Sequence, residues 1–491
     1  MNKIRCSLGL DLGTSGIKAV LLTDDGSVVA VACCDYPLIS PRPGWAETDP
    51  FLWESAARSV IKDVLQQVPD AEICGIGIDG QMHGTVLVDS IGKPVRPAIL
   101  WPDSRASTQL ANWKGLPVLT RSALANPIVP GMAGPIVSWV LHNEVSARNS
   151  VRYMLSPKDW LRSRFIPGSF VTDASDASAT LLWNVTTDCW DPEVASIANI
   201  PWGILPKVVD CFASAGELGR ESAEAWGLPP STPVSVGCGD VPATMVGLNA
   251  PPGRYTIVIG TGAQIVLPDA EPVAEAAPRF HTYRCAGQEY YAMSTVMNAG
   301  LALQNVIRLL GANWEELYAT AGLASEPGAP IFLPFFSGER LPQAIEPNQA
   351  NWLQIGLNTS RGSLMRAALE GVAFAIRRSL ESLPSARELT VDVAGGGSRK
   401  PRFVQMLADA IRRPLHQVAI ESPTAVGAAQ LGWTASGRGP VILPEKGPRV
   451  FTPRYSESLD DRYKQFLDLT RHIPAVGGAN TADDLHVSPE T

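Results

Sequence analysis

Short runs of apolar residues separated by turn-forming residues predict β-strands near the start of the chain. Two apolar runs, 8–12 and 17–22, flank a turn at 13–16, and a third run, 28–34, follows the next turn signal. Runs of this length joined by short turns predict an antiparallel meander. The first run also carries an acidic residue, Asp11, just before its turn.

The same arrangement returns near the middle of the chain. An apolar run at 255–259 leads to Gly260-Thr261-Gly262, and a second run follows at 263–267. Each half also has a later strand that ends in glycines and leads into a helix: 233–237 before 241–248, and 389–394 before 403–411. We therefore expect an α/β protein of two similar domains, with ligands gathering at strand ends and in a cleft between the domains.

Helical periodicity and capping residues predict the main helices. Asp49 followed by Pro50 is a typical helix start, and the helix should continue to about Val68. Three further segments read as helices: 215–226, 361–383 and 424–433.

Composition narrows the class of protein. Apolar residues make up 45% and charged residues 18% of the 491 residues, which is typical of a globular chain. The net charge is −8 without a basic block, so nucleic acid is not expected as a partner. The eight cysteines lack metal-type spacing, and we expect free thiols. We see neither a signal peptide nor an apolar run long enough to span a membrane, and we expect a cytoplasmic protein.

The first turn has the chemistry of an anion site. Gly13, Thr14 and Ser15 offer main-chain N–H groups and hydroxyls, and Lys18 adds a positive charge. Asp11 beside such a turn makes sense if a metal ion lies between it and a phosphate. The turn does not run into a helix or end in Gly-Lys-Ser/Thr, so it is not a P-loop. An ordinary hairpin is the competing interpretation.

Polar residues also follow three later strands. The strand at 72–78 leads to Asp79-Gly80-Gln81-Met82-His83-Gly84, which is typical of a ligand-facing loop. Asp240 follows Gly237-Cys238-Gly239 and could act as a base, or simply cap the next helix. Gly395-Gly396-Gly397 could hold another part of a nucleotide. Phosphate cradles, a metal ligand, a base and an acceptor pocket are what phosphoryl transfer requires.

Ten segments in a fixed order resemble one known family. They are GLDLGTSGIKAVL, GIDGQMHGTVLVD, RPAILWPDSR, SPKDWLR, SDASDASAT, GCGDVPATMVG, GTGAQ, FLPFFSGERLP, ALEGVAFAIR and AGGGSRKPRFVQMLAD. The chain resembles the FGGY carbohydrate kinases over about residues 7–433, and within that family it is most similar to xylulokinases.

The resemblance implies a fold and the boundaries of its domains. It implies two duplicated actin-like, ribonuclease H-like ATPase domains with an interdomain cleft. We expect an N-terminal domain at 1–249 on the sugar and phosphate side and a C-terminal domain at 250–472 on the nucleotide side. Residues 473–491 should form a mobile tail. The partners implied are a sugar and ATP, with Mg²⁺ as cofactor, and the chain could form a homodimer.

The resemblance also implies roles for individual residues. Asp240 would be the general base, and Asp11 and Asp240 would hold Mg²⁺ through water. The sugar would contact Gln81, Met82, His83, Trp101, Asp103 and Asp240. ATP would contact Gly13, Thr14, Ser15, Lys18, Gly260, Thr261, Gly262, Gly395, Gly396, Gly397, Arg399 and Gln405. Five residues could equally be pocket residues or structural ion pairs: Asp103, Arg105, Asp173, Asp176 and Arg340.

Three positions depart from the xylulokinase pattern and bear on the substrate. Val241 stands where Asn is usual, Gln264 follows a GTGA turn in place of GTSG, and Ile136 stands where Lys is usual. The expected reaction is D-xylulose + ATP → D-xylulose 5-phosphate + ADP. The alternatives are a kinase for another ketose or polyol, such as ribulose, and a non-catalytic sugar sensor.

Overall fold

The computed structural model describes residues 3–322, 328–340, 342, 345–443 and 449–473. Contacts divide the chain into two units, and each mixes helices with a β-sheet. The first unit contains the described residues of 1–254, 267–293 and 418–448, and the second those of 255–266, 294–417 and 449–491. The predicted domain limits, 1–249 and 250–472, stay a prediction. The predicted tail lies outside the described residues except for Ile473.

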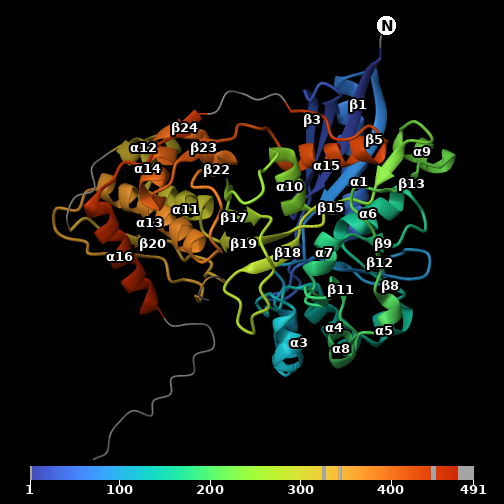
Figure 1. Ribbon diagram of the computed structural model, residues 1–491, viewed down its shortest axis with the longest axis horizontal. Helices are drawn as coiled ribbons and strands as arrows, with labels where there is room; N and C mark the ends of the chain where they lie inside the picture. The colour runs from blue at the N-terminus through green and yellow to red at the C-terminus, as the bar shows by residue number, and fades with distance from the viewer. Residues whose placement is uncertain (1–2, 323–327, 341, 343–344, 444–448, 474–491) are drawn as a thin grey trace, which may run out of the picture. The chain divides into compact units, whose positions relative to one another are not determined.

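The first unit is built on a mixed sheet that contains the predicted meander (Figure 1). Its strand order is β13 (Ser214–Glu217), β14 (Pro233–Ser235), β5 (Ala71–Gly80), β1 (Ile4–Leu12), β2 (Gly16–Thr23) and β3 (Val28–Asp35). Strands β1, β2 and β3 are antiparallel neighbours, whereas β1 and β5 are parallel. A short strand, β15 (Cys238–Gly239), also pairs with β5.

Helix α1 (Pro50–Gln67) covers one face of this sheet. Asp49 caps it by accepting a hydrogen bond from the N–H of Phe51 at 3.0 Å, as the sequence predicts. Leu8, Leu10 and Leu12 point to this face because side chains alternate along a strand, and they pack with Trp53. This is the main apolar core of the unit.

The opposite face of β1 and β5 carries small residues and then acids. Across the two strands, Gly9 pairs with Gly77, and Asp11 pairs with Asp79 at the carboxyl ends. Helix α15 (Pro423–Ala435) lies on this face (Figure 1). A Cβ at Gly77 would stand 1.7 Å from the carbonyl oxygen of Ala428, so only glycine permits this approach.

Helix α10 (Asp240–Leu248) packs on α15 in the same way. A Cβ at Gly427 would stand 1.8 Å from the carbonyl oxygen of Ala243, and one at Gly247 would stand 1.8 Å from that of Pro423. The two helices therefore touch backbone to backbone. This contact fixes where the first residue of α10, Asp240, stands beside the sheet.

The second unit has its own sheet with a similar plan. Within this unit, consecutive strands of the sheet are β17 (Ala263–Pro268), β16 (Thr256–Ile259), β22 (Val391–Ala394), β23 (Leu415–Gln417) and β24 (Arg449–Phe451). Strands β16 and β17 are antiparallel, and β16 and β22 are parallel. The buried ion pair between Arg462 and Glu370, 2.6 Å from nitrogen to oxygen, joins α16 (Glu457–Arg471) to α13 (Arg361–Glu381).

Shorter elements complete both units. The other helices are α2 (Leu110–Lys114), α3 (Val118–Ser122), α4 (Ala133–Asn143), α5 (Val145–Ser150), α6 (Pro157–Phe165), α7 (Ala174–Ser178), α8 (Pro192–Ile197), α9 (Arg220–Trp226), α11 (Gly300–Leu310), α12 (Trp314–Ala319) and α14 (Pro401–Ile411). The other strands are β4 (Glu47–Thr48), β6 (Val86–Val88), β7 (Ala98–Ile99), β8 (Tyr153–Leu155), β9 (Val171–Thr172), β10 (Trp183–Asn184), β11 (Cys189–Trp190), β12 (Lys207–Val208), β18 (His281–Arg284), β19 (Tyr290–Val296), β20 (Ile331–Leu333) and β21 (Asn351–Leu353).

Two local predictions need correction. The segment 215–226 is not one helix, because Ser214–Glu217 pairs with β14 and α9 begins only at Arg220. Gly239, rather than Asp240, is the N-cap of α10, so Asp240 is not present merely to cap the helix. None of the described helices is both long and apolar enough to cross a membrane.

The close approach of α15 can be tested with Gly77→Ala. The added methyl group meets backbone, which cannot move aside, and overpacking of this kind costs about 1–3 kcal/mol or more. We expect a lower midpoint of urea unfolding. Gly203→Ala is the matched control because a Cβ there would meet nothing within 4 Å. Equal midpoints for the two variants would contradict this account of the packing.

Candidate active site

Three carboxyl groups meet at the ends of neighbouring strands in the first unit. Asp11 lies next to the last residue of β1, Asp79 lies opposite it on β5, and Asp240 follows β15, which pairs with β5 beside Asp79. Burial raises the pKa of Asp79 well above its usual range, and the charges of Asp11 and Asp240 raise it further. Asp79 is fully buried. The three groups thus form one electrostatic cluster.

Asp240 has the pKa of a proton acceptor near neutral pH. Burial, followed by the negative charge of Asp11, raises the pKa of Asp240 to about 7, while a 2.8 Å hydrogen bond from the N–H of Val241 opposes the rise. Burial also raises the pKa of Asp11, and the positive charge of Lys18, its partner across β1 and β2, opposes that rise. A general base works best when its pKa lies near the operating pH.

The turn after Asp11 is tightly held. The N–H of Gly13 donates to the carbonyl oxygen of Gly16 at 3.0 Å, and the Tyr36 hydroxyl donates to the same oxygen at 3.1 Å. Gln81 donates to the carbonyl oxygen of Gly13 at 3.1 Å, and Trp101 donates to the hydroxyl of Thr14 at 2.9 Å. Two residues predicted for the sugar pocket therefore contact the predicted phosphate turn.

Met82 lies next to the loop that carries Asp240, and His83 contacts the end of α7. A Cβ at Gly239 would stand 2.7 Å from Cγ of Met82, and the hydroxyl of Tyr291 donates to the Met82 sulfur at 3.4 Å. His83 has a φ of 69°, a left-handed backbone that costs a non-glycine residue about 1–3 kcal/mol. Its Nδ1 lies 2.8 Å from the carbonyl oxygen of Ala179, which makes Nδ1 the donor.

Asp103 has a different environment from the other predicted pocket residues. Its oxygens accept hydrogen bonds from the Arg105 guanidinium at 2.8–3.1 Å and from the N–H of Ala46 at 2.7 Å. Arg105 is also paired with Glu47 at 2.7 Å. Between the two interpretations left open by the sequence, these contacts favour a structural ion pair.

The predicted nucleotide residues of the second unit gather at the ends of two parallel strands. Ile259 ends β16 before the turn 260–262, and Ala394 ends the neighbouring β22 before Gly395. The N–H of Gly260 donates to the carbonyl oxygen of Gly262 at 2.8 Å. Gly395 has a φ of 86°, and a Cβ there would stand 2.5 Å from the oxygen of Ile259.

Arg399 and Gln405 lie beyond this glycine loop. Arg399 is exposed at the end of a short 3₁₀ turn, Gly396–Arg399. The Gln405 amide, on α14, donates to Asp409 at 2.8 Å and to the carbonyl oxygen of Thr452 at 2.9 Å. Their contact with a nucleotide stays a prediction.

Sequence reasoning did not assign roles to Asp79 and Tyr291. Asp79 could have been found, because it shares the alternation of Gly75 and Gly77 and so faces the same side of the sheet. Tyr291 comes from β19, far along the chain, and no local pattern connects it with Met82.

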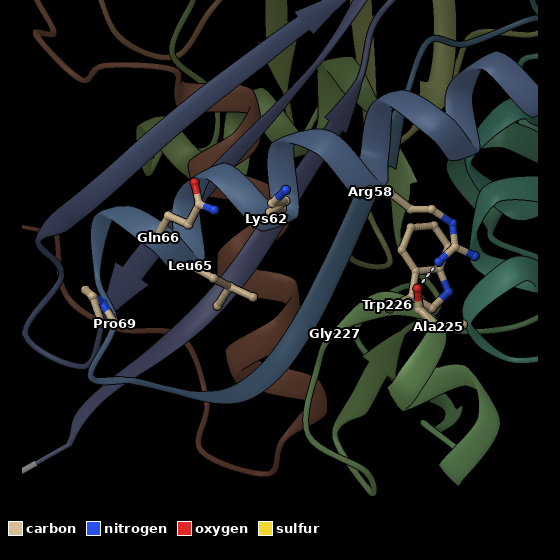
Figure 2. A pocket seen from close by; sticks show the side chains of 8 residues that line it. All are labelled: Arg58, Lys62, Leu65, Gln66, Pro69, Ala225, Trp226 and Gly227. Atoms are coloured by element: carbon tan, nitrogen blue, oxygen red, sulfur yellow. Dashed lines mark hydrogen bonds between the residues drawn. The ribbon is translucent and has the colours of Figure 1, made fainter.

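A cavity of about 580 Å³ lies elsewhere in the first unit (Figure 2). It runs between α1 and the end of α9, where Arg58 stacks over the Trp226 ring at 4.2 Å from its centroid. None of the residues predicted for the site lines it. This cavity is therefore no guide to the chemistry of the predicted site.

Comparison with known proteins decides the family. The N-terminal domain of the FGGY family of carbohydrate kinases matches residues 6–247, and the C-terminal domain matches residues 255–436. The chain belongs to the FGGY family. The protein is thus a carbohydrate kinase with the two-domain α/β fold of these enzymes, as the sequence predicts.

Known relatives agree with this assignment. A xylulose kinase of Klebsiella pneumoniae is 32% identical over 438 residues, which cover 87% of this kinase and 89% of the relative. A glycerol kinase of Alkalilimnicola ehrlichii is 30% identical over 505 residues, with 97% and 99% covered. A solved structure described as a xyloylose kinase from Brucella ovis matches with a TM-score of 0.86 at 30% identity, covering 95% and 99%. Family membership implies that this kinase uses ATP and a sugar.

The raised pKa of Asp240 predicts how stability changes with pH. Between the usual value of 3.8 and about 7 the folded kinase keeps a proton that the unfolded chain loses. Stability contributed by this group therefore falls as pH rises through that range. Asp240→Asn removes the effect, so the variant should gain stability relative to wild type from pH 5 to pH 8 in urea unfolding. Asp63→Asn, an exposed position on α1, is the control. A difference that stays constant with pH would contradict the assignment.

Proposed function

We propose that this kinase transfers the γ-phosphoryl group of ATP to D-xylulose, giving D-xylulose 5-phosphate and ADP, with Asp240 as general base. The observation that carries the proposal is the environment of Asp240, a partly exposed carboxyl group with a pKa near 7 that follows Gly239, the residue packed against Met82. The choice of sugar is supported by the xylulose kinase relatives.

In the proposed mechanism Asp240 accepts the proton of the sugar hydroxyl as its oxygen attacks the γ-phosphorus. The bond from phosphorus to the ADP oxygen breaks, and the leaving oxygen takes the electron pair. The main-chain N–H groups of the first turn, the hydroxyls of Thr14 and Ser15, and Lys18 would bind phosphate oxygens. Gln81, Met82, His83 and Trp101 would orient the sugar.

Mg²⁺ would be held by Asp11 and Asp240 through water, and when bound it neutralises phosphate charge. The carboxyl cluster fits such a cation, because like charges this close favour a compensating positive charge. Within the described part of the chain, no group of three or more Asp, Glu, His or Cys side chains forms a ready-made metal cage. Mg²⁺ normally uses one or two carboxylates together with waters and substrate phosphates, so this arrangement suits it.

The nucleotide would contact the second unit through two loops. We assign the phosphates to Gly260, Thr261 and Gly262, and the adenosine to Gly395, Gly396 and Gly397, with Arg399 and Gln405 nearby. The glycines let backbone approach a ligand closely, which supports this assignment.

A polyol or another ketose is the second candidate substrate. The glycerol kinase relative and Val241, a buried apolar residue directly after the base, both favour it. An ADP-release assay against D-xylulose, D-ribulose, glycerol and related polyols separates the candidates. The proposal for D-xylulose fails if another acceptor has a higher kcat/KM. The absence of ADP release with every acceptor would favour a non-catalytic sensor.

Asp240→Asn should abolish phosphorylation while ATP binding is largely kept. Removing a general base typically costs about 10²–10⁴-fold in rate. Activity is measured by ADP release, and ATP binding by calorimetry. Asp63→Asn again serves as the control. A variant that keeps more than about a tenth of the wild-type kcat would exclude Asp240 as the base.

Val241→Asn should raise turnover of D-xylulose if this departure from the xylulokinase pattern weakened hydroxyl recognition. A site that offers a hydrogen bond to a substrate hydroxyl discriminates far more strongly than an apolar one. The measurement is kcat/KM for D-xylulose and for glycerol. Val241→Leu, which stays apolar, controls for packing. Unchanged constants would show that this position does not affect selection of the sugar.

A further inference from the structure

Asp176 belongs to a buried charge cluster around Lys158. The ammonium group of Lys158 lies 2.7 Å from an oxygen of Asp159, 2.9 Å from one of Asp173 and 3.1 Å from one of Asp176. Lys158 is fully buried and Asp176 is only 5% exposed. One lysine thus neutralises only part of the charge of three acids.

The three acids differ in their remaining partners. Asp159 also accepts from Arg162 at 2.7 Å and from Ser156 at 2.8 Å. Asp173 caps α7 by accepting from the N–H of Ser175 at 2.8 Å. Among the described residues, Asp176 has one ion pair, with Lys158 at 3.1 Å, and lies near the Ser156 hydroxyl, but no donor reaches either of its buried oxygens with good hydrogen-bond geometry. Asp176 therefore has spare acceptor capacity.

Helix α7, which carries Asp176, is attached to the proposed sugar site at both ends. Ser175, the preceding residue, accepts a hydrogen bond from the N–H of Gly239 at 2.9 Å, next to Asp240. Ala179, three residues later, accepts from His83 at 2.8 Å. These two hydrogen bonds place the helix that carries Asp176 against the loop before Asp240 and against His83.

We infer that Asp176 binds the sugar, accepting a hydrogen bond from a hydroxyl other than the one that Asp240 deprotonates. This inference rests on the proposed function and deepens it, because it makes the substrate a compound with at least two hydroxyls held by separate carboxylates. A buried acceptor without a partner is costly, and a substrate hydroxyl would relieve that cost. A substrate without this hydroxyl would leave the carboxylate unsatisfied and be rejected.

The test compares kcat/KM of wild type and Asp176→Asn for D-xylulose and for its monodeoxy analogues. If the ADP-release assay identifies a better acceptor, that acceptor and its monodeoxy analogues are used instead. For one analogue, we expect wild type to lose at least tenfold in kcat/KM relative to the parent sugar. The variant should raise the KM for the parent sugar at least tenfold, leave the KM for ATP unchanged, and lose the discrimination against that analogue.

Asp173→Asn is the matched control, since Asp173 contacts the same lysine and lies at the start of the same helix. It should leave discrimination among the analogues unchanged, even if the melting temperature falls. Asp176→Glu keeps the charge beside Lys158 and provides a folded variant if Asp176→Asn is unstable; it too should lose discrimination. Equal discrimination by wild type and both Asp176 variants overturns the inference. Failure of wild type to phosphorylate D-xylulose itself would instead count against the proposed substrate.

Discussion

The close backbone contact among β1, β5, α15 and α10 is the constraint on which the proposed active site depends. Glycines on one face of the strands allow α15 to lie against the sheet, and glycines on α15 and α10 allow those helices to touch. The same strand face ends in Asp11 and Asp79, and α10 begins with Asp240. The geometry of the proposed site therefore follows from packing that tolerates no side chain at the contact points.

This arrangement concentrates negative charge where solvent cannot screen it well. Burial raises the pKa values of Asp11, Asp79 and Asp240, and repulsion from neighbouring carboxylates adds to the rise for Asp79 and Asp240. Such a cluster opposes folding at neutral pH, when the unfolded chain would ionise freely. It also gives Asp240 its affinity for a proton, so the feature that destabilises the fold is the one that suits it to act as a base.

Local patterns predicted those parts of the kinase that local sequence determines. The strand, turn and strand at the start and the capped helix α1 were predicted correctly, since alternation and capping residues are local signals. The helix predicted at 215–226 was wrong in its first part, because pairing of Ser214–Glu217 with β14 is a contact along the sheet. The partner of Met82, Tyr291, likewise comes from a distant segment, and only the fold brings the two together.

The two units share a plan but differ in charge at the corresponding point. In each unit, the strand before a Gly-Thr turn has one antiparallel and one parallel neighbour. In the first unit, β1 lies between antiparallel β2 and parallel β5. In the second, β16 lies between antiparallel β17 and parallel β22. Asp11 lies two residues before the first turn and pairs with Asp79. Val258 lies two residues before the second turn and pairs with Ala394, so the two pairs correspond. At this strand position, therefore, only the first unit carries a carboxylate pair. Carboxylates here would repel the polyphosphate of a nucleotide, and the second unit lacks them at this position. This difference in charge favours the division of roles proposed here, with proton transfer in the first unit and nucleotide binding in the second.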